Sequence, residues 1–248
     1  MEHILLIAGC SHAAGSEING SEDSVYNRTH SFGNQLANLM GYRAVNIAQN
    51  GSANGSIARS IIQWFKENYD PDKMKVFVCV AWTESVRLEV PCERTMWYEG
   101  SSKATDWFDK TSRNFYRVNM GWEGFGAKEK EVFGYFQKFI AQNNTFIEII
   151  SANLVLQLQY FLNMHDIDYV MCNCMHMFTL PDSHLQIYCD LIDKSKYMDW
   201  NKNDESFFWK YRNAGYVNPK AKYWHHDEVP HKLYAERLFK FIGEKTCS

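Results

Sequence analysis

The stretch HILLIAG, residues 3–9, decides the fold class. It is a short apolar run that ends in glycine, the pattern of a parallel strand buried on both faces. Residues 10–17, CSHAAGSE, then turn the chain. Residues 31–41, SFGNQLANLMG, place apolar side chains at helical spacing and close with glycine. This pattern predicts a helix packed on the first strand.

Strand and helix patterns alternate along the rest of the chain. We expect further strands at 44–49, 74–82 and 168–175, and helices at 56–69, in two stretches between about 130 and 165, and at 229–244. Such alternation implies a parallel sheet joined by right-handed crossovers, with helices on both faces. The sequence therefore predicts an α/β fold: a three-layer α/β/α sandwich with a central, mainly parallel, flavodoxin-like sheet. We expect it to be one domain over residues 1–248.

Two aromatic-rich insertions interrupt this pattern, at about 90–128 and 177–224. Their composition, with Gly, Asp and Lys among the aromatic residues, predicts lids or binding surfaces more than core. Trp97, Trp107 and Trp122 are candidates for stacking on sugar rings, and packing explains them equally well.

Composition excludes several function classes. The net charge of -3 gives no reason to expect a nucleic-acid partner, which requires a clustered basic surface. No stretch approaches the 18 or so uninterrupted apolar residues of a membrane-spanning helix, and the N-terminus resembles a strand rather than a signal peptide. Seven cysteines is an odd count, which favours reduced thiols and a cytoplasmic location. Cys172 and Cys174 are expected in the core.

The loops that follow the strands carry the candidate chemistry, because ligands bind at the carboxyl ends of parallel strands. Loops that begin at Cys10, Asn50 and Thr83 should open on one edge. Ser11 follows Gly9 at the end of the first strand. It is placed either to begin a helix whose N–H groups stabilise an oxyanion or simply to cap that helix.

The other two loops offer further candidates. Gly51 lets the backbone approach a ligand closely and, with Asn54, could supply an oxyanion donor, although a plain glycine turn also fits. Thr83 and Arg87 offer a hydroxyl and a guanidinium. The alternative for these two is a Thr-capped helix start with a solvated arginine.

Histidines gather in residues 222–238, KYWHHDEVPHKLYAERL. One of them, entering from the last loop, could be the general base for Ser11. His225, His226, Asp227 and His231 could instead bind zinc, but adjacent side chains diverge and rarely chelate one ion. We expect no metal and no cofactor.

Together AGCSHAAGSE, NIAQNGSANGS, VAWTESVR and HHDEVPHKLYAERL, in this order, resemble the blocks of the SGNH/GDSL hydrolase superfamily, especially its divergent bacteriophage versions. The resemblance covers 3–88 and about 145–244. It implies that Ser11 is the nucleophile and that Gly51 is an oxyanion donor. Cys10 stands where the family has the aspartate of GDS. Thr83 replaces the family's oxyanion-binding asparagine, a loss that costs on the order of a hundredfold in rate.

The last block departs most from the family. Alignment on the second histidine makes His225 the catalytic base, with His226 as second choice. Lys222 and Tyr223 then occupy the positions of the orienting aspartate. A Ser-His dyad, an acid from elsewhere such as Asp227, or an inactive site all remain open.

Two functions follow from the resemblance. The first is a serine esterase acting on an ester or O-acetyl group of a glycan or lipid. The alternative is a catalytically degenerate structural or glycan-binding protein, for example a virion-associated one. A homo-oligomer or a virion component would then be the partner.

Overall fold

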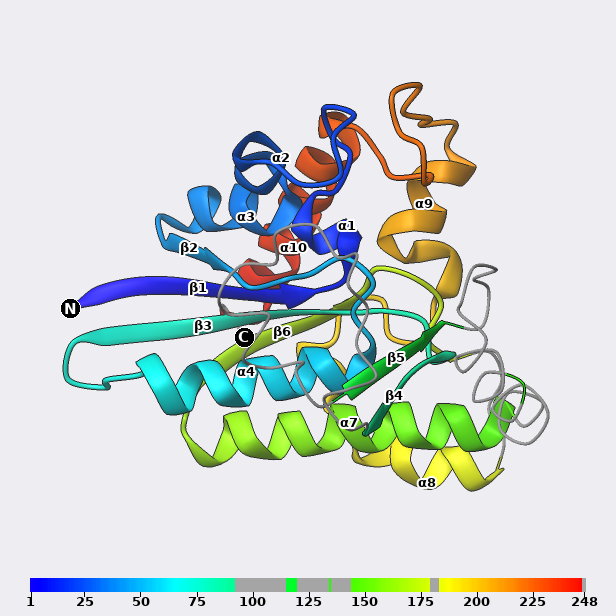
Figure 1. Ribbon diagram of the computed structural model, residues 1–248. Helices are drawn as coiled ribbons and strands as arrows, with labels where there is room; N and C mark the ends of the chain where they lie inside the picture. Colours follow the sequence, from blue (N-terminus) through cyan, green and yellow to red (C-terminus); the bar gives the residue numbers. More distant parts are fainter. Residues whose placement is uncertain (92–114, 120–133, 135–143, 179–182, 247–248) are drawn as a thin grey trace.

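The computed structural model describes residues 1–91, 115–119, 134, 144–178 and 183–246 (Figure 1). Its centre is a four-stranded, entirely parallel sheet with the strand order β2-β1-β3-β6. The strands are β1 (Glu2–Gly9), β2 (Arg43–Asn46), β3 (Met74–Trp82) and β6 (Asp168–Asn173). The predicted α/β fold class is confirmed.

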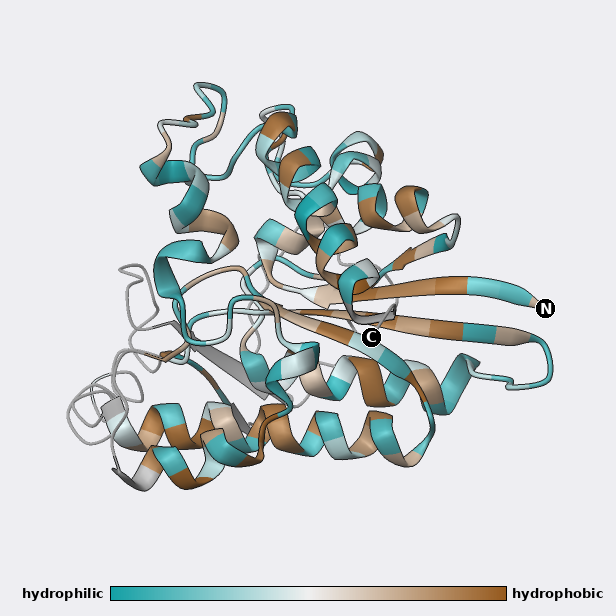
Figure 2. Ribbon diagram, turned by 180° about the vertical axis from the view of Figure 1, so that it is seen from behind, coloured by the Kyte–Doolittle hydropathy of each residue, from teal (hydrophilic) through white to brown (hydrophobic). Residues whose placement is uncertain are grey.

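Strand β1 lies in the middle of the sheet and pairs with both β2 and β3. Its residues 4–8 are fully buried, because helices cover both faces of the sheet. Figure 2 shows the hydrophobic colour of the strands concentrated in their central parts, between the two helical layers. The continuous apolar pattern of residues 4–8 is thus a direct consequence of this central place.

Helices pack on both faces of the sheet (Figure 1). One layer buries Phe32, Phe207 and Tyr234 among other apolar side chains. It consists of α1 (Ser11–Ala14), α2 (Val25–His30), α3 (Phe32–Met40), α9 (Phe207–Asn213) and α10 (Glu228–Thr246). The other buries Ile61, Val155 and Leu185. It consists of α4 (Asn54–Asn68), α7 (Asn144–Met164) and α8 (Ser183–Leu191).

Beyond β6 the sheet is extended by a single parallel bridge. Met171 of β6 bridges to Tyr197, and the N–H of Met198 donates to the Met171 carbonyl at 2.8 Å. Short 3-10 helices, η2 (Lys194–Lys196) and η3 (Asn203–Glu205), flank this segment.

The expectation that 177–224 forms a lid or binding surface is wrong for much of its described part. Met177, Tyr197, Phe207 and Tyr211 are buried in the two cores. The aromatic richness arises because α9 and the segment beside β6 pack their rings against the sheet layers. Residues 179–182 lie outside the described structure.

The first insertion contains an antiparallel pair, β4 (Arg87–Pro91) with β5 (Phe115–Asn119). A turn and then a strand therefore follow Thr83, so the alternative of a Thr-capped helix start is excluded there. Trp97, Trp107, Trp122 and the predicted helix before α7 lie outside the described residues.

Helix α7 is long and apolar. Over Thr145–Met164 it is long and apolar enough to cross a membrane, with a mean hydropathy of 1.3, but half of its apolar stretch is buried in the protein. Core helices of globular proteins share this length and composition. Cys172 and Cys174 are buried free thiols, which confirms their assignment to the core.

Candidate functional site

The candidate nucleophile lies where β1 turns into α1. At Gly9 an added Cβ would lie 2.5 Å from the Cβ of Ala13 and 2.9 Å from the Ala81 carbonyl oxygen. Only glycine therefore lets α1 fold back against the strand end. Cys10 is the N-cap and Ser11 the first helical residue, so the predicted helix start is present. The backbone N–H of Ser11 has no backbone acceptor among the described residues.

A buried carboxylate holds His225. The Nδ1 atom of His225 lies 2.6 Å from Oε2 of Glu17, and both side chains are almost inaccessible to solvent. With a proton on Nδ1, the imidazole donates to the carboxylate and leaves Nε2 as the basic nitrogen. This is the relation of base and orienting acid in a Ser-His-acid triad.

Backbone amides hold Glu17 in turn. The N–H groups of Lys222 and Tyr223 donate to its two carboxylate oxygens at 2.8 and 2.9 Å. Burial raises the pKa of Glu17, but the hydrogen bonds from His225 and from these two amides outweigh it, and the net pKa is lowered. Glu17 is thus held as an anion. Its φ of 61° is unusual for a residue with a side chain, and such strain often occurs at functional sites.

Glu17 therefore lies, relative to His225, where the resemblance would place an orienting acid. Lys222 and Tyr223, which the resemblance aligns with the expected aspartate, contribute backbone donors to Glu17 instead. The available signal was Glu17 itself, the last residue of the AGCSHAAGSE block. Asp227, the earlier candidate, accepts from the N–H of Val229 in the first turn of α10.

The loop that carries His225 contacts the helix that carries Ser11. The rings of His12 and His225 lie 4.8 Å apart between centroids. Burial lowers the pKa of His12 well below its ordinary value, and the neighbouring His225 and His226 add to this. Ser11 Oγ makes no hydrogen bond to another residue of the described part of the chain.

The other two histidines of the last block have structural contacts. His226 is 2% exposed, and its Nε2 lies 3.0 Å from the Phe208 carbonyl oxygen. Nδ1 of His231 accepts from the N–H of Phe32 at 3.1 Å, which ties α10 to the start of α3. Of these three histidines, His225 is the one that both bonds a buried carboxylate and lies beside α1.

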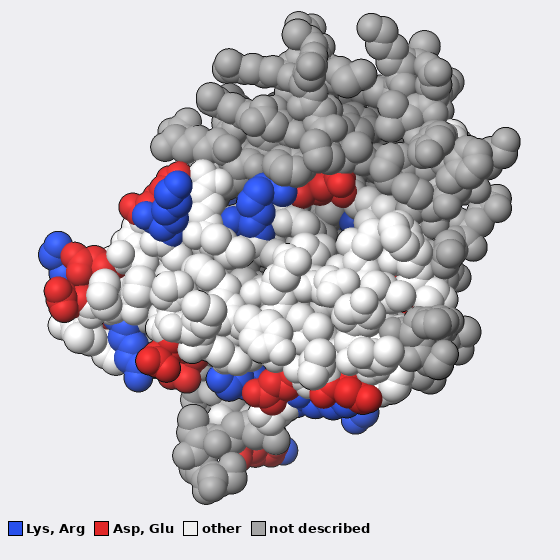
Figure 3. All heavy atoms as spheres, turned by 90° about the horizontal axis from the view of Figure 1, so that it is seen from below, with Lys and Arg blue, Asp and Glu red and all other residues white. Residues whose placement is uncertain are grey.

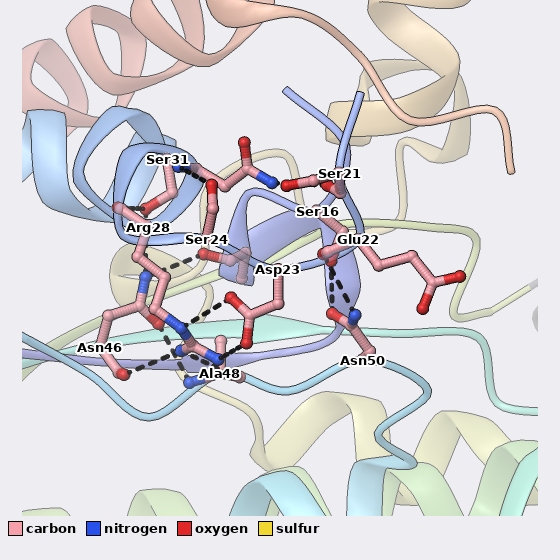
Figure 4. A network of polar contacts seen from close by, with 12 residues as sticks. Ser16, Ser21, Glu22, Asp23, Ser24, Arg28, Ser31, Asn46, Ala48 and Asn50 are labelled. Atoms are coloured by element: carbon pink, nitrogen blue, oxygen red, sulfur yellow. Dashed lines mark hydrogen bonds and ion pairs between the residues drawn. The ribbon is translucent and has the colours of Figure 1, made fainter. Parts of the chain in front are cut away.

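The loop after β2 is anchored to the segment between α1 and α2 by the polar network of Figure 4. Ser16 Oγ donates to the side-chain oxygen of Asn50. Arg28 binds both oxygens of Asp23 at 3.0 Å and donates to the Ala48 carbonyl at 3.2 Å. The network therefore connects the Gly51 loop with the segment that carries Glu17.

Gly51 has a φ of 71°, which favours glycine. Its N–H has no backbone acceptor within the described ranges, as an oxyanion donor requires. The Asn54 side chain is engaged elsewhere: it accepts from the N–H of Thr83 at 2.9 Å and donates to the Thr83 carbonyl at 3.2 Å. Asn54 thus holds together the loops after β2 and β3.

Thr83 is fully buried, and its hydroxyl lies beside Cys10 rather than at the solvent edge. A hydrogen bond with Cys174 lowers the pKa of Cys10 to about 6 against the effect of its burial, and the charge of Arg87 contributes. Arg87 also pairs with Glu84 at 3.3 Å. A buried thiol with a lowered pKa therefore stands where the resemblance places the aspartate of GDS.

Metal ligation has no support in the described part of the chain, where no group of three or more His, Cys, Asp and Glu side chains could hold an ion. His225, His226, Asp227 and His231 have the separate partners given above.

Comparison with known proteins finds likeness in structure alone. No protein-family model and no curated protein sequence matches the chain. A carbohydrate esterase family 2 enzyme with a carbohydrate-binding domain, from Corynascus thermopiles (Myceliophthora fergusii), superposes with a TM-score of 0.52 at 12% identity. The match covers 100% of this chain and 68% of that chain.

Two further structures match at lower TM-scores. The esterase EstA from Pseudoalteromonas sp. has a TM-score of 0.43 at 9% identity, over 99% of both chains. A lipolytic protein of the G-D-S-L family from Veillonella parvula has 0.42 at 9% identity, over 96% of this chain and 97% of that one. The parallel sheet between helical layers and the likeness to the carbohydrate esterase together show an α/β/α fold of the SGNH hydrolase type.

Proposed function

We propose that this protein is a serine ester hydrolase in which Ser11 is the nucleophile, His225 the general base and Glu17 the orienting acid. One observation carries the proposal: the buried Glu17 carboxylate bonds Nδ1 of His225 at 2.6 Å, and that histidine belongs to the loop that packs on α1. A structural histidine needs no buried anion fixed by two backbone amides.

The reaction follows from these positions. Ser11 Oγ attacks the ester carbonyl carbon while Nε2 of His225 accepts the hydroxyl proton. The carbonyl oxygen becomes an oxyanion next to the N–H groups of Ser11 and Gly51. His225 then protonates the departing alcohol. A water molecule deprotonated by His225 attacks the acyl carbon, and His225 returns that proton to Ser11 Oγ as the acid leaves. Glu17 stabilises the imidazolium in both steps.

We propose an O-acetyl group of a glycan as the substrate. Ser11 is 9% exposed, which suits a small acyl group more than a long acyl chain. The fold is shared with an enzyme described as a carbohydrate esterase. The side-chain oxyanion donor of the family is missing, since Asn54 is engaged with Thr83 and Thr83 is buried. We therefore expect turnover to be lower, by on the order of a hundredfold, than with that donor present.

Covalent labelling tests the proposal without knowledge of the substrate. A fluorophosphonate probe should phosphonylate Ser11 with loss of fluoride, and p-nitrophenyl acetate should be hydrolysed. Ser11→Ala should abolish both, while Ser21→Ala, on the exposed part of the same segment, should leave them unchanged. Equal labelling and hydrolysis by wild type and Ser11→Ala would refute the assignment and leave the degenerate binding protein as the function.

A further inference from the structure

The outer surface of the layer formed by α7 and α8 is almost without charge. Figure 3 looks onto the molecule from this side and shows Lys, Arg, Asp and Glu mainly around the rim of a broad uncharged area. Glu148 is the single charged residue of α7, and it is buried. On α8 the single charged residue, Asp190, lies 3.9 Å from Lys194.

Apolar and amide side chains form a regular stripe on this surface. On α7 they are Ile150, Asn153, Gln157, Tyr160 and Met164. These positions alternate in spacing between three and four, as in the contact stripe of paired helices. Tyr160 is 52% exposed and Met164 82%. On the neighbouring α8, Ile187 is 65% exposed and Leu191 55%.

We propose that this stripe, with Ile187 and Leu191, is the interface of a homodimer in which α7 packs antiparallel on α7 of a second copy. The stripe is self-complementary about a two-fold axis near Val155: Ile150 then meets Tyr160 of the second copy, and Asn153 meets Gln157 of the second copy. Apolar side chains face apolar ones, and the two amides can exchange hydrogen bonds. A surface without charge presents no like charges to itself, which suits a two-fold interface.

Chemistry favours a second copy over a membrane, and size makes the contact a weak one. Helix α7, with 21 residues, is about 31 Å long and α8, with 9 residues, about 14 Å; at about 10 Å width each, the pair covers roughly 450 Å² on each copy. About 900 Å² in total is the size of a weak interface, so we expect a dimer that dissociates on dilution. Helices that lie on membranes carry Lys and Arg on their polar face, and α7 has neither.

Sedimentation of the full chain tests the interface. At about 50 μM, wild type should sediment at twice its mass of 29.0 kDa. Ile150→Lys and Tyr160→Glu should each weaken dimerisation at least 100-fold. The double variant should recover a dimer, because each new lysine meets a new glutamate of the other copy, while within one chain the two positions lie about 15 Å apart.

The matched control is Val25→Glu, which adds the same charge at an 82% exposed valine on α2, in the opposite layer, and should remain dimeric. Circular dichroism establishes that every variant is folded. A monomeric wild type at 50 μM, or a folded double variant that stays as monomeric as Tyr160→Glu, would overturn the proposal. So would a monomeric wild type that co-sediments with phosphatidylcholine vesicles, since the stripe would then bind lipid.

Discussion

Replacing Glu17 by glutamine removes the negative charge and one hydrogen-bond acceptor but keeps the size and shape of the side chain. The carboxylate accepts three hydrogen bonds: from Lys222 N–H on one oxygen, and from Tyr223 N–H and His225 Nδ1 on the other. In glutamine one of these oxygens becomes an NH₂ group. If it replaces the oxygen next to His225, it can only donate to Nδ1, and the proton of His225 moves to Nε2. The base is then lost although the geometry is kept.

The expected loss in kcat is roughly 1,000- to 10,000-fold, the usual effect of the wrong histidine tautomer in a triad. At about 1.36 kcal/mol for each factor of ten, this is about 4 to 5.5 kcal/mol of transition-state stabilisation. At least one of the three bonds to the buried anion is also lost. Because a hydrogen bond to a charged group contributes about 1.5–3 kcal/mol, the free energy of unfolding should fall by about 2 kcal/mol.

Hydrolysis of p-nitrophenyl acetate gives kcat for wild type and Glu17→Gln, and urea denaturation gives the free energy of unfolding. Glu22→Gln, on the exposed part of the same segment, is the matched control and should change neither. Fluorophosphonate labelling of Ser11 should slow in Glu17→Gln by a similar factor. A Glu17→Gln enzyme within threefold of wild type, while Ser11→Ala is inactive, would refute the assignment of Glu17 as orienting acid.

The pH dependence of stability gives a second readout. The pKa of Glu17 is lowered in the folded state, so its contribution is present above the ordinary carboxyl pKa and is lost as the pH falls through the lowered value. The difference in unfolding free energy between wild type and Glu17→Gln should therefore persist from pH 7 to pH 5 and shrink below about pH 4.

Two further predictions concern the fold around the site. Gly9→Ala forces a methyl group against Ala13 and the Ala81 carbonyl and should lower the free energy of unfolding by about 3 kcal/mol; a loss below 0.5 kcal/mol in urea denaturation would contradict the packing. Burial holds the pKa values of His12 and His231 well below their ordinary value, so the unfolded chain binds more protons and stability should fall as the pH drops below about 6.5. Thermal melts of wild type from pH 7.5 to pH 5.5 should show this decline, and it should be smaller in His231→Gln.

The sequence predicted the sheet well because its signals are local. Residues 3–9 and 74–82 are continuous apolar runs, and only a strand covered on both faces has that pattern in so short a segment. Aromatic composition misled the interpretation of 177–224, because the same rings that suit a binding surface also suit a core. Whether a ring such as that of Phe207 is exposed depends on which layers lie next to it, and that is a property of the packed chain.

For the candidate site, the sequence by itself determined that Ser11 follows the first strand, that histidines enter from the last loop, and that the usual aspartate is missing. Only the tertiary structure decided which side chains meet. The carboxylate of Glu17 and the imidazole of His225, which it brings together, are distant in sequence, and no local pattern specifies such a contact. It exists because α1 and the segment with Glu17 follow the end of β1, and the loop between α9 and α10, which carries His225, packs beside them in the folded chain.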